Sequence, residues 1–380
     1  MSDGFHYPLC ELPPETAALR AEVRGFVQAG AADWPPEQKA LSWTGFDRAF
    51  SRELGRRGWI GMTWPKRYGG GERTSLERYV VLEELLAAGA PVGAHWIADR
   101  QSGPLILRVG TEAQKERFLP AIVRGEMAFC IGMSEPDAGS DLAAIRSRAV
   151  KVDGGWRLDG RKIWTTNAQH CDFMIGLFRT VAASEKARQA GLTQFLIDCR
   201  SSGIEIRPIR DLSGEAHFNE ITFDTVFVPD DLLIGAEGQG WAQVNAELAL
   251  ERSGPDRYLS SFPLLTLALD SVPDEDGAAR EVGRMVSELV TLREMSLSVA
   301  GMLQAGHSPL NEAALVKDLG TGFEQRLPET VRALLDPGAN YDTPLAAMLA
   351  QLTQVAPVFS LRGGTREILR GMIARGLGLR

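Results

Sequence analysis

Four short stretches of the chain carry the side chains that could do chemistry. MSEPDAGSD (residues 133–141) and RKIWTTNAQHCD (residues 161–172) offer hydroxyls and turn-type backbone N–H groups that could hold a polar ligand beside one broad aromatic side chain, Trp164. LALERSG (residues 248–254) places a carboxylate beside a guanidinium. SLRGGTREILR (residues 360–370) places two glycines before a helical run, without a carboxylate, histidine or cysteine ahead of Thr365. A proton acceptor for this last stretch must therefore come from elsewhere in the chain.

A purely structural role is the alternative for these stretches. A turn of Gly, Pro, Ser and Asp can serve only to join two elements, and a lone tryptophan in a strand usually belongs to a core. Glu251 and Arg252 lie at the end of an apolar helical stripe that begins at Trp241, where they could instead form an ion pair at the helix end. The residue types alone leave both interpretations open.

Three kinds of pattern follow one another along the chain. Residues 14–125 carry apolar side chains at three- and four-residue intervals, as in TAALRAEVRGFVQAG, which predicts helices. Residues 127–229 show short alternating runs that predict strands, and in KVDGGWRLDGRKIW the DGG and LDG steps both predict hairpin turns. Helical periodicity returns after GAEGQGW and persists to the end, which predicts a helical bundle.

Composition and charge argue against several classes of protein. At a usual size of about 150 residues per domain, the 380 residues suggest two or three domains. A net charge of −8 without basic clusters argues against nucleic acid or an anionic membrane as partner. Four cysteines without a CxxC pair or histidines at ligand spacing predict neither a metal site nor a disulfide framework. No signal peptide, transit peptide or membrane-spanning apolar run is recognisable, so a cytoplasmic location is expected.

The first two stretches together resemble the paired flavin-contacting motifs of the acyl-CoA dehydrogenase family at nearly every position. WPKRYGGG and GTEAQKERFLPAIVRGE are similar to the N-terminal helical domain of that family, FNEITFDTVFVPDDLLIGAEGQGW to the end of its β domain, and GGTREILRGMIARGLGL to its terminal helix. The resemblance implies an α+β fold with an N-terminal helical domain (residues 1–125), a central β-barrel domain (residues 126–235) and a C-terminal four-helix bundle (residues 236–380). It also implies FAD, held between the β domain and the bundle.

The resemblance implies an oxidoreductase that acts on CH–CH groups. An acyl-CoA thioester loses its α-proton to a carboxylate and its β-hydride to flavin N5, which gives a 2-enoyl-CoA. The electrons then usually pass to electron-transfer flavoprotein. A homodimer or homotetramer is the usual assembly in the family.

Individual positions take expected roles from the family. The matching cofactor residues are Ile131, Met133, Ser134, Trp164 and Thr166 around the flavin ring, and Thr365 at the pyrophosphate, where a helix N-terminus suits an anion. Ser140 matches a contact to the CoA arm, and Arg252 matches a residue that faces CoA. The backbone N–H of Gly363 is expected to join a flavin ribityl hydroxyl in binding the thioester carbonyl, an oxyanion-type contact that acidifies the α-carbon.

The expected base does not lie where most members of the family carry it. Many members have the catalytic glutamate immediately before the Gly-Thr of the last motif, and this chain has Gly363 there. A smaller set carries the glutamate in a segment LxLER on the first bundle helix, which matches Glu251. A glycine in place of glutamate also leaves space beside the acyl chain, which favours a branched, cyclic or otherwise bulky acyl group.

Two departures from the family pattern keep other functions open. ERSGPDRYLSS stands in place of an Arg-x-x-Phe-Gly segment, and a Gln-rich GGxG turn before the terminal helix is missing. In the family both features complete the FAD site of a neighbouring subunit. One alternative is therefore a non-catalytic or half-site subunit of a hetero-oligomeric acyl-CoA dehydrogenase. Another is a relative with altered chemistry, namely a desulfinase, an oxidase or a monooxygenase.

Overall fold

The chain folds into two compact units, each assembled from separate segments. The computed structural model describes residues 4–182, 187–273, 275–335 and 343–379, and the side chains of residues 42 and 247–251 lie outside the described part. Unit 1 comprises residues 1–45, 73–91 and 251–380, and unit 2 comprises residues 46–72 and 92–250. The division into domains 1–125, 126–235 and 236–380 stays a prediction.

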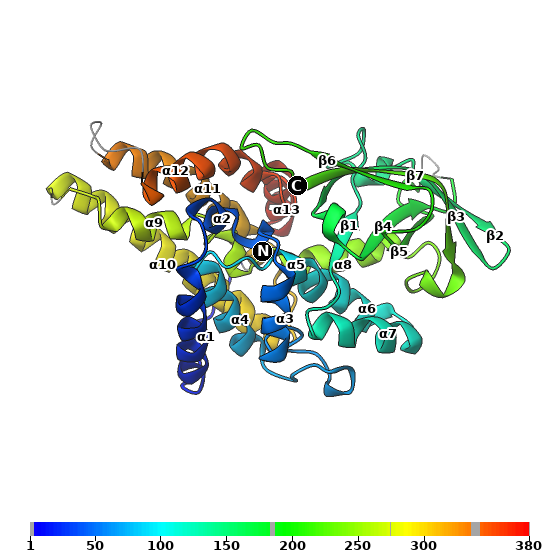
Figure 1. Ribbon diagram of the computed structural model, residues 1–380, viewed down its shortest axis with the longest axis horizontal. Helices are drawn as coiled ribbons and strands as arrows, with labels where there is room; N and C mark the ends of the chain where they lie inside the picture. The colour runs from blue at the N-terminus through cyan, green and yellow to red at the C-terminus, as the bar shows by residue number, and fades with distance from the viewer. Residues whose placement is uncertain (1–3, 183–186, 274, 336–342, 380) are drawn as a thin grey trace. The chain divides into compact units, whose positions relative to one another are not determined.

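Unit 1 is helical (Figure 1). Its helices are α1 (Thr16–Ala31), α2 (Pro36–Leu41), α4 (Ser75–Ala87), α9 (Phe262–Leu269), α10 (Asp276–Gln304), α11 (Leu310–Leu334), α12 (Pro344–Val355) and α13 (Arg366–Gly376). The long helix α10 buries Met285, Leu292 and Val299 on one side and packs against α4 and α11, and α11 also contacts α12 and α13. The helical character predicted for both ends of the chain is confirmed.

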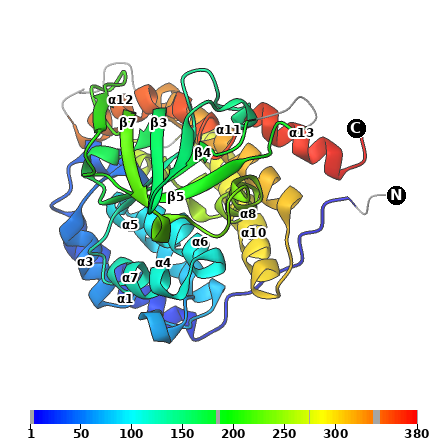
Figure 2. The same cartoon turned by 90° about the vertical axis from the view of Figure 1, so that its right-hand side faces the viewer.

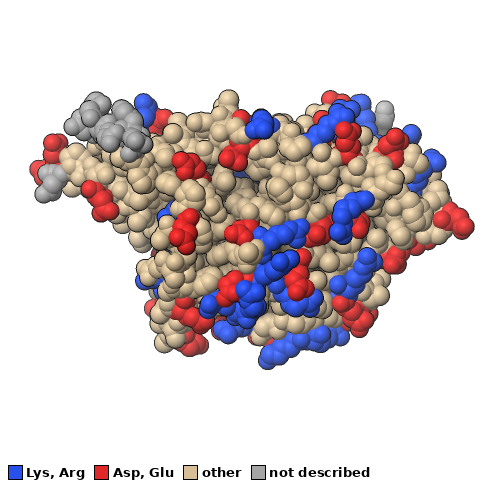
Figure 3. Space-filling model, viewed as in Figure 1, with Lys and Arg blue, Asp and Glu red and all other residues tan. Residues whose placement is uncertain are grey.

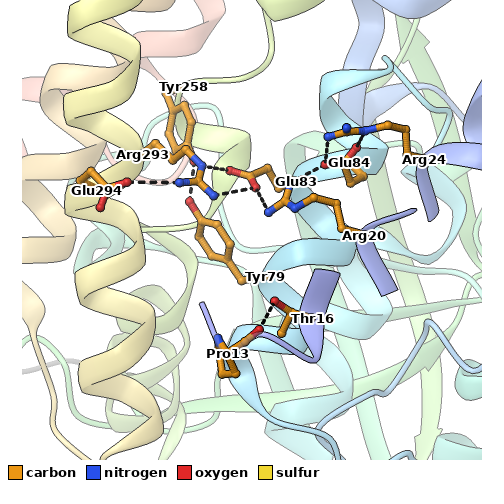
Figure 4. Close-up of polar contacts among 10 residues, drawn as sticks. All are labelled: Pro13, Thr16, Arg20, Arg24, Tyr79, Glu83, Glu84, Tyr258, Arg293 and Glu294. Carbon is orange, nitrogen blue, oxygen red and sulfur yellow. Dashed lines mark hydrogen bonds and ion pairs between the residues drawn. The ribbon is translucent and has the colours of Figure 1, made fainter. Parts of the chain in front are cut away.

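A buried network of charges joins three helices of unit 1 (Figure 4). Glu83 of α4 accepts hydrogen bonds from Arg20 of α1 at 2.7 Å and from Arg293 of α10 at 2.6 Å. The next residue, Glu84, accepts from Arg24 of α1 at 2.9 Å. Both carboxylates are almost fully buried, so each needs the guanidinium groups that surround it. The network thereby fixes α1 and α10 against the same turn of α4.

Unit 2 contains the sheet and shorter helices (Figures 1 and 2). Its helices are α3 (Arg48–Arg56), α5 (Gly93–Ile97), α6 (Gly103–Val109), α7 (Glu112–Val123) and most of α8 (Gly240–Glu251). Its strands are β1 (Phe129–Gly132), β2 (Arg148–Val152), β3 (Gly155–Thr166), β4 (Phe173–Arg179), β5 (Leu192–Asp198), β6 (Ile204–Ile209) and β7 (Phe218–Pro229). The strands pair in the order β1-β4-β2-β3-β7-β6, and β5 pairs with β4. All pairs are antiparallel except those that join β1 and β2 to β4.

One predicted hairpin turn is correct and the other is wrong. The DGG step joins β2 to β3, where Val152 pairs with Gly155 and Gly154 has a φ of 70°. The LDG step lies inside β3 and does not form a turn. The register of β3 against β7 shifts at this step, between Leu158 and Gly160. Gly160 therefore marks a β-bulge in a 12-residue strand, which glycine also favours.

The surface carries charges of both signs. On the face shown in Figure 3, Lys and Arg side chains are interspersed with Asp and Glu side chains. Such mixing keeps the electrostatic potential of a surface moderate. Among the described residues, no helix combines the length and the apolar character that crossing a bilayer requires.

Candidate cofactor and substrate site

The two motif stretches of unit 2 lie side by side. The loop that follows β1 returns along β3, where the Ile163 amide donates to the Ser134 carbonyl at 2.9 Å. This hydrogen bond places Ser134 opposite Ile163, so the loop that carries Met133 and Ser134 runs beside the part of β3 that precedes Trp164 and Thr166. Four of the residues that the sequence predicts around the flavin ring therefore come from one locally connected part of unit 2.

An apolar cluster anchors the same loop. Ala138 is buried with Ile145, Leu177, Leu192 and Val244, and Met133 and Trp241 pack at the edge of this cluster. Val244 and Trp241 belong to the apolar stripe predicted for α8. The loop 133–141 is thus packed against the beginning of α8 within unit 2. Ser140, the predicted CoA contact, is exposed on this loop, and Ile131 is half-buried in β1.

Trp164 lies in an unusual backbone conformation on β3. Its φ of 61° is left-handed, and the register of β3 against β7 shifts between Lys162 and Thr165. The residue is 55% exposed, and its ring meets that of Phe218 edge-on with centroids 5.9 Å apart. The alternative of a core tryptophan is therefore wrong for Trp164. Left-handed backbone at a bulky residue is strained and persists where the surroundings fix it, often at functional sites.

We expect Trp164→Gly to weaken FAD binding while changing the free energy of unfolding by less than about 1 kcal/mol. Glycine relieves a left-handed strain of roughly 1–2 kcal/mol, and this offsets the loss of an aromatic pair worth about 0.5–1.5 kcal/mol. The matched control is Trp156→Ala, since Trp156 is only 6% exposed in the same strand; it should cost about 3–5 kcal/mol. Denaturant titration gives the free energy of unfolding of both variants. A large loss of stability in Trp164→Gly would instead indicate that Trp164 is a structural core residue.

A buried ion pair that the sequence did not reveal lies beneath these residues. The ammonium group of Lys162 donates to Glu135 Oε1 at 2.8 Å and to the Met133 carbonyl at 3.1 Å, and its side chain is fully buried. Burial lowers the pKa of Lys162 to about 8, although the charge of Glu135 opposes this shift. Burial also opposes ionisation of Glu135, but the charge of Lys162 and the Arg146 amide outweigh it and lower the pKa of Glu135. Both groups are therefore charged at neutral pH.

His217 lies next to the end of β3, and its largely buried ring is expected to make the stability of the folded protein depend on pH. Its carbonyl accepts from the Asn167 amide at 2.6 Å, and burial lowers the pKa of its ring despite nearby Asp211. Below its ordinary pKa of about 6.5, the unfolded chain takes up a proton that the folded chain resists. We therefore expect the free energy of unfolding to fall as the pH drops below about 6.5. His217→Gln should flatten this dependence in denaturant titrations between pH 7 and pH 5, and an unchanged slope would exclude His217 as the cause.

The residues of this region fit a flavin. Trp164 exposes a broad aromatic ring, and the half-buried Ser134 and Thr166 lie on the adjoining loop and strand. A flat ring system needs an apolar face together with a few donors for its heteroatoms. This region carries an exposed aromatic residue and two half-buried hydroxyl residues, which are groups of these two kinds.

In unit 1 the glycine turn is held by buried cations. Gly363 and Gly364 have φ values of 65° and 97°, which glycine adopts without strain. The buried Arg252 donates to the Gly363 carbonyl at 3.4 Å, and the buried Lys317 donates to the Gly364 carbonyl at 2.7 Å. Thr365 caps α13 by accepting from the Ile368 amide at 3.4 Å. The structure thus brings Arg252 to the turn that contains Gly363 and Thr365, and the contact of Arg252 with CoA stays a prediction.

A second buried charge network supports this turn. Arg362 donates to Glu324 Oε2 at 2.6 Å, to the Asp256 carbonyl at 2.9 Å and to Ser260 Oγ at 2.8 Å. The Ser260 amide donates to Glu324 Oε1 at 2.7 Å. Burial raises the pKa of Glu324, although the charge of Arg362 opposes this. Arg362 therefore connects the turn to α11 and to the segment before α9.

The side chain of Glu251, the predicted base, lies outside the described residues. Glu251 is the last residue of α8 and directly precedes Arg252. The predicted cofactor residues of the β region belong to unit 2, whereas Glu251, Arg252, Gly363 and Thr365 belong to unit 1. The base assignment remains a prediction from the sequence.

Comparison with known proteins identifies the family. Residues 13–126 match the family model of the acyl-CoA dehydrogenase N-terminal domain, and residues 130–226 match that of the middle domain. Acyl-CoA dehydrogenase FadE29 of Mycobacterium tuberculosis is 30% identical over 96% of this chain and 96% of its own length. Acyl-CoA dehydrogenase FadE34 of the same organism is 32% identical over 96% of this chain, which spans about half (49%) of that relative.

Solved structures agree with this result. A structure described as the Tcur3481-Tcur3483 steroid ACAD is 27% identical, has a TM-score of 0.85 and covers 97% of this chain and 98% of its own. A chain of the ChsE4-ChsE5 complex from Mycobacterium tuberculosis is 26% identical with a TM-score of 0.82, covering 97% of this chain and 99% of its own. Family membership accounts for the helical ends of the chain, for the curled sheet and for the paired motifs on that sheet. The chain belongs to the acyl-CoA dehydrogenase family of flavin-dependent oxidoreductases.

Proposed function

We propose that the protein oxidises an acyl-CoA thioester to a 2-enoyl-CoA. The observation that carries this proposal is the hydrogen bond from Ile163 to Ser134, which sets the two flavin-contacting motifs side by side. When bound, FAD supplies the acceptor for the hydride from the β-carbon. Electron-transfer flavoprotein is the proposed acceptor of the electrons.

The chain's own residues divide the remaining work. The hydroxyls of Ser134 and Thr166 orient the flavin ring, and Trp164 covers it and excludes water. Ile131 and Met133 contribute neighbouring contacts, and Thr365 binds the pyrophosphate at the start of α13. The Gly363 N–H holds the thioester carbonyl and thereby acidifies the α-carbon. Glu251 removes the α-proton, while Ser140 and Arg252 bind CoA.

The proposed acyl group is bulky and cyclic. Gly363 leaves space where many family members carry a glutamate side chain. One structural relative is described as a steroid ACAD, which supports a ring-containing acyl-CoA over a straight-chain one. A panel of both kinds of acyl-CoA separates the two, and preference for the straight chain contradicts this part of the proposal.

A half-site subunit of a hetero-oligomer is the second candidate function. It is supported by the ERSGPDRYLSS segment, which replaces the family's Arg-x-x-Phe-Gly segment, and by the relative described as the ChsE4-ChsE5 complex. In this case the chain contributes part of an FAD site that a related chain completes. A homodimer or homotetramer is the assembly expected otherwise.

The test is the absorption spectrum of the protein purified alone, followed by anaerobic titration with the acyl-CoA panel. We expect bound flavin whose band near ~450 nm bleaches with one class of acyl-CoA. Flavin that appears only after addition of a related chain would favour the half-site subunit. Flavin that bleaches with no acyl-CoA would favour the altered chemistry of an oxidase, monooxygenase or desulfinase.

A further inference from the structure

The Glu135–Lys162 ion pair connects the two segments that carry the flavin-contacting motifs, namely the loop after β1 and strand β3. Glu135 follows Ser134 in the loop after β1, and Lys162 precedes Trp164 by two residues in β3. The side chains are 8% and 0% exposed, so both charges are removed from water. Burial of such a pair contributes little net stability, and an apolar pair of similar volume is often equally stable. A role other than stability is therefore needed to explain it.

Each member of the pair also binds backbone groups: Lys162 binds the loop itself, and Glu135 binds the segment that leads into β2. Glu135 accepts from the Arg146 amide at 2.6 Å and from the Ser147 amide at 2.9 Å. Lys162 holds the Met133 carbonyl at 3.1 Å. The residues on both sides of Ser134 are thus fixed by charge-assisted hydrogen bonds. The Ser134 carbonyl is fixed as well, by the Ile163 amide.

The surroundings of Lys162 restrict its position further. Its ammonium group lies 5.1 Å from the centre of the Phe178 ring. The charge of Arg179 on the same strand, β4, also attracts Glu135. Because these contacts restrict the side chain of Lys162, they also hold the neighbouring backbone of β3 against the loop. The strained conformation of Trp164 needs such a restraint to persist.

We propose that Glu135 and Lys162 are positioning residues that lock Ser134 and Trp164 in the orientation that contacts the flavin ring. The inference rests on the proposed flavin-binding role of these two residues. The pair touches neither flavin nor substrate in this scheme, and acts only through the backbone on either side of it. Loss of one charge leaves the other buried without its ionic partner, which weakens the attachment of the loop to β3.

The test uses Glu135→Gln, Lys162→Met and the double variant, with Lys151→Met as the matched control. Lys151 forms an exposed ion pair with Asp230 on the same sheet, away from the loop. Titration of flavin-free protein with FAD gives the dissociation constant, and hydrogen exchange of segments 133–138 and 160–166 in the flavin-free protein reports the restraint directly. Thermal unfolding is measured in parallel.

We expect each single variant to weaken FAD binding roughly tenfold, within the range for groups of one hydrogen-bond network, and to speed exchange in both segments. The double variant should weaken FAD binding by a smaller factor than the product of the two single-variant factors, because it leaves no unpaired charge. Lower thermal stability with unchanged FAD binding would overturn the inference, as would a wild type that binds no FAD. A wild type that binds FAD but oxidises no acyl-CoA, with the same variant effects, would overturn the proposed reaction alone.

Discussion

Glu251→Gln is expected to retain its fold and its flavin but to lose acyl-CoA oxidation by roughly 10²–10⁴-fold, the usual contribution of a positioned general base. Glutamine keeps the size of the side chain and cannot take up the α-proton. Rapid anaerobic mixing with the preferred acyl-CoA measures the step directly, because flavin bleaching follows it. The dissociation constant of the acyl-CoA should change much less than this rate.

The control is Glu247→Gln, one helical turn earlier on α8. It removes a carboxylate from the same helix without touching the LxLER match. An equal loss of the oxidation rate in both variants would show that the rate depends on the total negative charge of the helix and not on Glu251 as the base. Full activity in Glu251→Gln would move the base to another residue or to a second chain.

Arg362→Met is expected to lower the free energy of unfolding by about 3–5 kcal/mol, the usual cost of leaving one member of a buried pair uncompensated. The variant leaves Glu324 fully buried without its guanidinium partner and removes one hydrogen bond each from the Asp256 carbonyl and from Ser260 Oγ. Denaturant or thermal unfolding measures the loss. The exposed pair of Arg284 and Glu281 supplies the control, since Arg284→Met should change stability little.

The loss in Arg362→Met should also depend on pH. Burial raises the pKa of Glu324, and removal of Arg362 removes the largest of the interactions that lower this pKa. A carboxyl group whose pKa is raised by folding binds more protons in the folded state, so stability falls as the pH rises through that pKa. The variant should therefore be closer to wild type at pH 5 than at pH 8. The double variant Arg362→Met/Glu324→Gln should recover most of the loss, and failure of both expectations would assign the effect to packing.

Most elements of the fold were predictable because their signals are local. The apolar spacing in α1 and α10 and the alternation in β7 persist over enough residues to define the element. The LDG step misled because a glycine after aspartate has the same composition in a turn and in a bulge. Only the pairing of β3 with β7 distinguishes the two, and that pairing depends on residues some 65 positions apart.

The candidate site was predictable only as far as its motifs extend. Ser134, Trp164 and Thr166 lie in two contiguous stretches, so their order identifies them. Glu135 and Lys162 stand in the same stretches, yet nothing in the spacing pairs a carboxylate with an ammonium group 27 residues away. The left-handed backbone of Trp164 was equally hidden, because tryptophan has no preference for it. Tertiary packing decides both features.

The interleaving of the two units sets the order in which the chain can fold during synthesis. Unit 2 is complete once Leu250 has been made, whereas unit 1 needs the N-terminal helices, α4 and the terminal helix α13 together. Domains generally fold as units and contacts between distant segments form slowly. We therefore expect the sheet of a growing chain to form before unit 1 is complete, and the face of α4 that packs against α10 to stay exposed until α10 has been made.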